Sequence, residues 1–179
     1  PRGIQSHEIR IIGGQWKRTK LKVADKPGLR PTPDRVRETL FNWLGQDLSG
    51  QRCLDVFAGT GALGFEAASR GAAEVVLVEQ DAALVAQLQQ VRTQLLALQP
   101  LEPVAPPVLL VQRGEGVSAL RQAAPASRDL IFLDPPFDAP LFEPALAACA
   151  RALTPRGLVY LEAPVQWTDA QLAPLGLAV

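Results

Sequence analysis

The chain has 179 residues, of which 47% are hydrophobic and 20% are charged, and its acidic and basic side chains balance. This length and composition suit one folded domain with room for a small appendage, and they exclude wholesale disorder. No apolar run approaches the roughly 18 residues of a membrane span, and the first residues do not resemble a secretory signal. We therefore expect a cytoplasmic protein that has no membrane partner.

The neutral total hides an uneven distribution of charge. Residues 1–37 contain ten lysines and arginines against three acids, a balance of +7, so the remaining 142 residues carry −7. Such asymmetry indicates an anionic partner for the N-terminal part of the chain. A solvated hairpin face explains the charge equally well, and the charge alone does not decide between the two.

Cysteine and histidine usage gives no indication of a metal site. Cys53 and Cys149 lie in apolar contexts, and His7 is the only histidine. We expect two buried thiols rather than a disulfide, and no metal.

The first 45 residues read as a small extension. Two short strands are expected around residues 9–12 and 21–23, joined by a glycine-containing turn, and residues 25–35 form a proline-rich loop. A helix is expected from Pro33 to about Leu44, with Thr32 as its N-cap. Its apolar face should carry Val36, Leu40, Trp43 and Leu44.

From residue 52 onward, strands and helices alternate. Strands are expected at residues 52–57, 74–79, 108–112, 129–134 and 157–162, and helices at 61–71, 82–98, 116–124 and 139–153. This alternation predicts an α/β fold whose sheet is doubly wound and mainly parallel, covered by helices on both faces. We accordingly divide the chain into an N-terminal extension, 1–45, and a main domain, 46–179.

A glycine-rich loop follows the first strand of this domain, in "LDVFAGTGALG" (54–64). Gly59 and Gly61 permit a tight turn and close approach of a ligand to the backbone. Asp55 precedes them and would repel a pyrophosphate, so a cationic or zwitterionic nucleoside suits the loop better than a dinucleotide. S-adenosylmethionine, which carries a sulfonium and an ammonium, is such a ligand.

Acids also follow the next two strands. Glu79 ends the second strand, where a carboxylate can accept hydrogen bonds from both hydroxyls of a ribose. Glu115 follows the third strand, where it can accept from an adenine amino group or act as an ordinary acid in the first turn of a helix. Phe57 and Gln80, which adjoin the loop and Glu79, complete the predicted cofactor site.

The fourth strand leads into "LIFLDPPFD" (130–138). Pro135 and Pro136 remove two backbone donors and stiffen the chain, so the Asp134 carboxylate and the Pro135 carbonyl can be aimed at one point. Two acceptors followed by the aromatic Phe137 suit a planar exocyclic amine: the acceptors take its N–H groups and the ring stacks on the base. The alternative is a strand-ending proline turn with a core phenylalanine.

Together, "DVFAGTGALG", "VEQD" and "LDPPF" resemble class I S-adenosylmethionine-dependent methyltransferases that act on planar nitrogens. The stretch "RIIGGQWKRTKL…GLRPTPDRVRETLFNWL" (10–44) is similar to the RsmD family, bacterial methyltransferases of a guanine N2 in 16S ribosomal RNA. The resemblance covers about residues 9–164. It implies that Asp134 to Phe137 form the catalytic loop and that Asp55, Gly59, Gly61 and Glu79 bind the cofactor. Implied RNA-binding residues are Arg10, Lys17, Arg18, Lys20, Lys22, Arg30, Thr32 and Arg35.

The chain departs from the family pattern at two points. The family commonly has Asn or Asp where this chain has Glu115, and only 15 residues follow Pro164, too few for the helix and hairpin that normally close the sheet. We therefore expect the C-terminal strands of this chain to be incomplete. By resemblance the partner is 16S RNA within a 30S subunit or an assembly intermediate, and the enzyme is a monomer.

Other functions are compatible with parts of this pattern. Related proline loops serve adenine-N6 and glutamine-N5 methyltransferases, although these more often begin with Asn, and the N-terminal stretch counts against them. A catalytically silent RNA-binding assembly factor would not need the complete Asp134–Phe137 loop. A nicotinamide dehydrogenase is disfavoured by Asp55.

Overall fold

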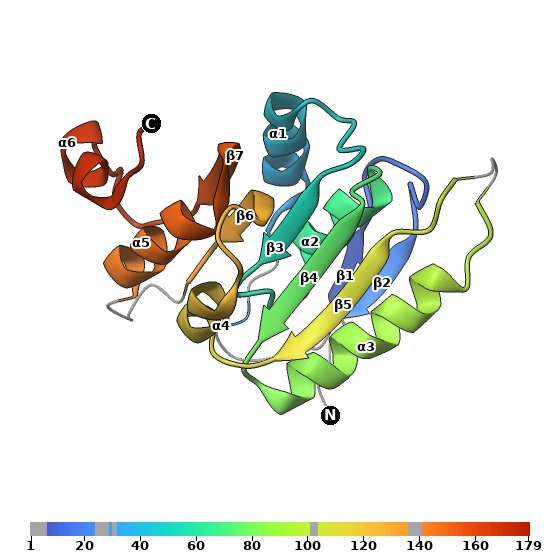
Figure 1. Ribbon diagram of the computed structural model, residues 1–179. Coiled ribbons are helices and arrows are strands. Elements are labelled where there is room, and N and C mark those ends of the chain that lie inside the picture. Colours follow the sequence, from blue (N-terminus) through green and yellow to red (C-terminus); the bar gives the residue numbers. More distant parts are fainter. Residues whose placement is uncertain (1–6, 24–28, 30–31, 101–103, 136–140) are drawn as a thin grey trace.

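The computed structural model describes residues 7–23, 29, 32–100, 104–135 and 141–179 (Figure 1). In these ranges the strands are β1 (His7–Arg10), β2 (Lys20–Val23), β3 (Arg52–Asp55), β4 (Glu74–Glu79), β5 (Val108–Arg113), β6 (Arg128–Leu133) and β7 (Leu153–Leu161). The helices are α1 (Asp34–Leu44), α2 (Ala62–Ser69), α3 (Ala82–Leu96), α4 (Gly116–Gln122), α5 (Phe142–Ala152) and α6 (Asp169–Leu172), followed by the 3-10 helix η1 (Ala173–Leu175). No helix in these ranges has the length and apolarity to cross a membrane.

The five strands from β3 to β7 form one parallel sheet in the order β5-β4-β3-β6-β7. The chain moves outward from β3 to β5 and then returns to place β6 on the other side of β3. This reversal creates a switch point between β3 and β6, and in such sheets ligands bind at the carboxyl ends of the strands beside it. Figure 1 shows the arrowheads of β4 and β5, which mark the carboxyl ends of these strands, close to α4.

Both faces of the sheet are covered, as the alternating pattern predicts. One core contains Cys53, Val75 and Leu77 together with residues of α1, α2, α3 and the β1–β2 hairpin. The other contains Leu54, Val76 and Val78 together with residues of α4, α5 and α6. Neighbouring residues of one strand enter opposite cores because side chains alternate along a strand. This accounts for the nearly unbroken apolar runs of β4 and β6.

The hairpin packs against α2, and all eight residues of that helix are buried. Two glycines allow the close approach. A Cβ on Gly14, whose φ is +78°, would lie 1.9 Å from the carbonyl oxygen of Ser69, and one on Gly13 would lie 2.8 Å from the Arg70 guanidinium carbon. The interface is completed by Trp16, which is buried and whose backbone N–H donates to the Ser69 hydroxyl at 3.0 Å.

A buried glutamate of α2 fixes the hairpin and α1 in place. The Glu66 carboxylate accepts from the backbone N–H groups of Ile12 (2.9 Å) and Gly13 (3.0 Å). It also accepts from the guanidinium groups of Arg37 (3.2 Å) and Arg70 (3.0 Å). The two arginines and two amides satisfy the carboxylate, which removes most of the cost of burying its charge.

Helix α1 differs from its predicted form at the N-cap and in its buried face. Its N-cap is Pro33, and no side-chain capping bond forms, so Thr32 does not cap it as predicted. The buried residues are Arg37, Leu40 and Phe41, whereas Trp43 is 85% exposed. The prediction of an apolar stripe that included Val36 and Trp43 was wrong, because Arg37 faces inward to reach Glu66.

After β7, residues 165–179 carry α6 and η1 and contain no strand. Thr168 and Gln171 form a capping box at the start of α6. Leu172 is buried in the core that lies beneath α4 and α5. Among the described strands β7 therefore forms one edge of the sheet, with β5 at the other.

Candidate active site

Acidic residues lie together at the carboxyl edge of the sheet, by which we mean the side on which its parallel strands end. Asp55 and Glu79 are the last residues of β3 and β4, while Asp134 and Glu162 directly follow β6 and β7. Because these strands are parallel neighbours, their carboxyl ends meet at one edge. The structure therefore brings together the acids that the sequence predicted at three separate motifs and adds Glu162.

The glycine loop connects β3 to α2 across this edge. Gly59 and Gly61 have φ values of +56° and +81°, which favour glycine. A Cβ on Gly61 would collide with the Phe65 ring at 2.4 Å, so this glycine is required by packing. Among the described residues, a Cβ on Gly59 would touch Leu29 alone, at 3.2 Å, so these residues leave the backbone at Gly59 accessible to a ligand apart from this one neighbour.

Glu79 braces the loop. One carboxylate oxygen accepts from the backbone N–H of Gly59 at 3.1 Å and the other from the N–H of Asp81 at 2.8 Å. Each carboxylate oxygen has two lone pairs, so both retain the capacity to accept another hydrogen bond. The half-buried Glu79 side chain can thus hold the loop and bind a ligand hydroxyl at the same time.

Asp55 lies beneath the loop and is only 3% exposed. Its carboxylate accepts from the backbone N–H of Gly64 at 3.1 Å, in the first turn of α2. Burial, together with the smaller effect of the neighbouring Asp134 and Glu79 charges, raises the pKa of Asp55 to about 7 despite this hydrogen bond. A cationic ligand near these acids would relieve their mutual repulsion.

Asp134 and Glu162 lie side by side. Their carboxyl groups are within hydrogen-bonding reach. Burial is the main cause that raises the pKa of Asp134 to about 7, and the Glu162 charge is the second. Tyr160, two residues before Glu162, has its pKa raised by burial and by the same two acids. Asp134 is therefore poised to exchange a proton near neutral pH, as a general base requires.

The other predicted cofactor residues adjoin the edge. Phe57 is half-buried and packs against the start of α4, where a Cβ on Gly116 would lie 2.8 Å from its ring. Gln80 is exposed directly after Glu79. The Glu115 carboxylate is the N-cap of α4 and accepts from the backbone N–H groups of Val117 and Ser118. Burial acts to raise the pKa of Glu115, but these hydrogen bonds outweigh it and lower the pKa.

Most predicted RNA-binding residues lie on the outside of the hairpin and α1. Strand β2 alternates exposed lysines with buried Leu21 and Val23. The exposed basic side chains are those of Arg10, Lys17, Arg18, Lys20, Lys22 and Arg35, and Thr32 is half-buried. Arg10 is 3.6 Å from Asp34 in an exposed ion pair. By contrast Arg37, also part of the N-terminal basic segment, is 1% exposed and belongs to the Glu66 network.

Part of the predicted catalytic loop lies outside the described residues, namely Pro136 and Phe137, and so does Arg30 of the predicted RNA face. Pro135 is described and buried.

Sequence reasoning missed Glu162 and Leu29. An available signal for Glu162 was its position: it ends the fifth predicted strand, as Glu79 ends the second. Leu29 lies in the proline-rich loop, and only the fold shows that its side chain reaches Gly59.

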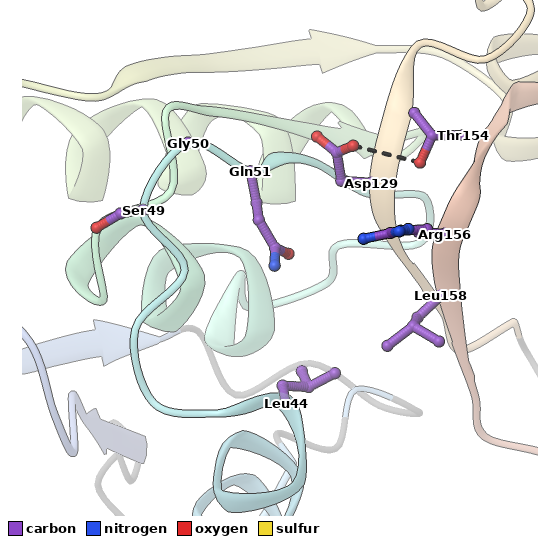
Figure 2. Close-up of a pocket in the computed structure, with 8 residues that line it drawn as sticks. All are labelled: Leu44, Ser49, Gly50, Gln51, Asp129, Thr154, Arg156 and Leu158. Atoms are coloured by element: carbon purple, nitrogen blue, oxygen red, sulfur yellow. Dashed lines mark hydrogen bonds between the residues drawn. The ribbon is translucent and has the colours of Figure 1, made fainter.

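A separate pocket of about 280 Å³ lies on the opposite side of the sheet from the acids, where the strands begin (Figure 2). Its lining residues are Leu44, Ser49, Gly50, Gln51, Asp129, Thr154, Arg156 and Leu158. They adjoin the amino ends of β3, β6 and β7. The Asp129 carboxylate accepts hydrogen bonds from the backbone N–H of Arg52 and the hydroxyl of Thr154, and so connects these strand ends. Ligands of doubly wound sheets bind at the other edge, which contains the acids.

Comparison with known proteins agrees with this geometry. A family profile described as conserved hypothetical protein 95 matches residues 9–175. Ribosomal RNA small subunit methyltransferase D of Escherichia coli K12 is 42% identical over 168 residues, which are 93% of this chain and 80% of that protein. The protein of the same name from Haemophilus influenzae is 40% identical over 158 residues, 87% of this chain and 78% of that protein.

Among solved structures, "Putative methyltransferase yhhF" from Escherichia coli superposes with a TM-score of 0.75 at 41% identity. The match covers 90% of this chain and 85% of that one. The predicted fold, a class I methyltransferase sheet with an N-terminal hairpin, is confirmed. With a profile match over nearly its whole length and relatives of this similarity, the chain belongs to the RsmD family that its motifs predict.

Proposed function

We propose that the chain transfers the methyl group of S-adenosylmethionine to the exocyclic N2 of a guanine in 16S ribosomal RNA. Membership of the family supports the reaction class, since its relatives are ribosomal RNA small subunit methyltransferases by name. The observation that carries the proposal is the placement of Asp134 at the switch point of the sheet, directly after the strand that lies beside Asp55 and the glycine loop. An acceptor for the substrate amine then lies next to the proposed cofactor site.

The residues at the carboxyl edge fit such a cofactor. Glu79 retains acceptor capacity for the ribose hydroxyls while it holds Gly59. Asp55, whose burial disfavours its charge, suits a positive sulfonium or ammonium group. Phe57 and Gln80 complete the proposed binding set, and Glu115 would act chiefly through the start of α4 that it caps.

The cofactor supplies a methyl group activated by its bond to a sulfonium. The exocyclic nitrogen is a weak nucleophile, because its lone pair is delocalised into the base. Asp134 accepts an N–H hydrogen bond, which favours a pyramidal nitrogen with a free lone pair. The bound cofactor would supply the methyl group and leave as a neutral thioether, and Asp134 would take the proton that the nitrogen releases. Positioning and electrostatics supply the acceleration.

We further infer that residues 1–45 form an RNA-facing extension of the methyltransferase domain, 46–179. The exposed lysines and arginines of the hairpin would contact phosphates and so position the RNA without reading its sequence. The substrate would be 16S RNA within a 30S subunit or an assembly intermediate, and the reaction would take place in the cytoplasm. The enzyme would act as a monomer.

The test is transfer of tritiated methyl groups to 16S RNA and, separately, to 30S particles that lack the modification. Nucleoside analysis of the product should give N2-methylguanosine. Methyladenosine as the product, or no transfer to either substrate, would refute the proposal.

A further inference from the structure

Glu162 has a defined place beside the proposed catalytic acid. The register of β6 and β7 pairs Leu133 with Leu161, and the backbone N–H of Glu162 donates to the Leu133 carbonyl at 3.0 Å. Asp134 and Glu162 are therefore adjacent in register, because each directly follows one of two paired residues at the ends of neighbouring parallel strands. Their side chains converge rather than diverge, since the carboxyl groups are within hydrogen-bonding reach.

One carboxylate oxygen of Glu162 is buried and receives no hydrogen bond from the described residues. An unsatisfied buried acceptor is costly, and two adjacent carboxylates cannot both stay charged at low cost. A proton shared between Glu162 and Asp134 removes both costs. Each residue keeps a second oxygen that can accept from a ligand, and the shared proton must leave before Asp134 can take another from the substrate.

Two acceptors side by side match a ligand edge with two adjacent N–H donors. Guanine has such an edge, because its N1–H lies next to its N2 amino group. Adenine does not, since its N1 is an acceptor that would face a carboxylate oxygen. Enzymes that extract a base read this edge by hydrogen bonds.

We propose that Glu162 selects guanine by accepting the N1–H hydrogen bond while Asp134 accepts from N2. This inference rests on the proposed function and extends it from the reacting amine to the identity of the base. Glu162 is thus a specificity-determining residue, and the proton released from N2 still passes to Asp134.

The test compares two substrates and four proteins. Once the target guanine is mapped, 16S RNA is assembled by ligation with either guanine or 2-aminopurine at that position, and is reconstituted into particles if these are the substrate. 2-Aminopurine keeps the amine but has an acceptor at N1. The proteins are the wild type, Glu162→Leu, Glu162→Gln, and Glu143→Leu as a matched change of an exposed glutamate on α5.

We expect the wild type and Glu143→Leu to prefer guanine in kcat/KM. Glu162→Leu should lower the guanine value about 10-fold to 100-fold and leave 2-aminopurine nearly unchanged, the range for one well-made hydrogen bond to a base. Glu162→Gln should retain most of the preference, because its amide N–H can replace the shared proton while its oxygen accepts from N1. Calorimetric affinity for S-adenosylmethionine should be equal in all four proteins, which checks that each is folded.

Equal losses on both bases in Glu162→Leu, or an unchanged guanine value, would overturn the role of Glu162 while guanine methylation by the wild type still stood. If the wild type transferred no methyl group to guanine, the proposed function itself would fail, and this inference with it.

Discussion

At the scale of single residues, the concentration of negative charge at one sheet edge dominates the site. Asp55 and Asp134 both have pKa values raised to about 7, in each case chiefly by burial. The edge therefore binds protons at neutral pH in the absence of a cationic ligand. A cationic cofactor beside Asp55 should displace the proton of that residue, so cofactor binding and protonation are coupled.

The raised pKa of Asp134 predicts how methyl transfer depends on pH. The groups that face Asp134 in the described residues are Glu162 and Tyr160 on the β7 side and Asp55 on β3. A protonated Asp134 cannot take the proton that the amine releases, so kcat/KM should rise with pH and level off above an apparent pKa near 7. Asp134→Asn should lose this rise. A wild-type profile that is flat from about pH 6 to pH 8 would contradict the assignment of Asp134 as the base.

A second prediction at this scale concerns Glu79. Glu79→Ala removes an acceptor for the ribose and also the hydrogen bond that holds Gly59. We expect the affinity for S-adenosylmethionine to fall by about 1–3 kcal/mol, the range for hydrogen bonds to a charged group. Calorimetry with Glu143→Ala as the surface control measures this. Unchanged affinity, or tight binding of NAD by the wild type, would refute the cofactor site.

At the scale of elements, α2 links the proposed RNA face to the proposed cofactor site. The helix begins at the glycine loop and carries Glu66, which holds the hairpin and α1. Glu66→Ala would leave Arg37 and Arg70 buried without their common partner. We expect the free energy of unfolding to fall by about 3–5 kcal/mol, as for other broken buried ion pairs.

Urea unfolding of Glu66→Ala and of the exposed control Glu143→Ala checks this prediction. A loss below about 1 kcal/mol, the scale of a surface ion pair, would show that the network does not anchor the hairpin.

The same network explains which elements the sequence could predict. The parallel sheet was predictable because its strands are apolar runs separated by helical segments, and that pattern is local. The buried face of α1 was not, because the buried acid that pairs with Arg37 lies 29 residues further along the chain. The positions of Asp55, Glu79, Asp134 and Glu162 were predictable, because each ends a recognisable apolar run. That Glu162 lies beside Asp134 was not, because it depends on which strand lies next to β6.

At the scale of the whole molecule, charge is divided between the N-terminal segment and the remaining domain. Residues 1–37 carry +7 and residues 38–179 carry −7, while the total is zero. Attraction to RNA must therefore come from a local surface rather than from the net charge. Arg37 is buried and cannot contribute, so the described residues that can do so are the exposed basic side chains of the hairpin and of the start of α1.

Neutralising Lys17, Arg18, Lys20 and Lys22 together should weaken RNA binding and reduce its salt dependence. The slope of log affinity against log salt should fall by about 0.7 for each phosphate that the protein no longer neutralises. Cofactor affinity should not change, because these side chains lie on the outside of the hairpin. Arg121→Gln with Arg156→Gln, two exposed arginines elsewhere, serves as the control. Equal affinity and slope in the quadruple variant would make the hairpin a solvated face.

The measurement that tests the central claim most directly is single-turnover methyl transfer by Asp134→Ala, together with its affinity for S-adenosylmethionine. If Asp134 accepts from the substrate amine, the rate should fall by orders of magnitude while the cofactor binds as in the wild type, because the group acts on the substrate. Asp134→Asn should keep part of the activity, since its amide oxygen still accepts a hydrogen bond. A wild-type rate in Asp134→Ala would contradict the proposed chemistry.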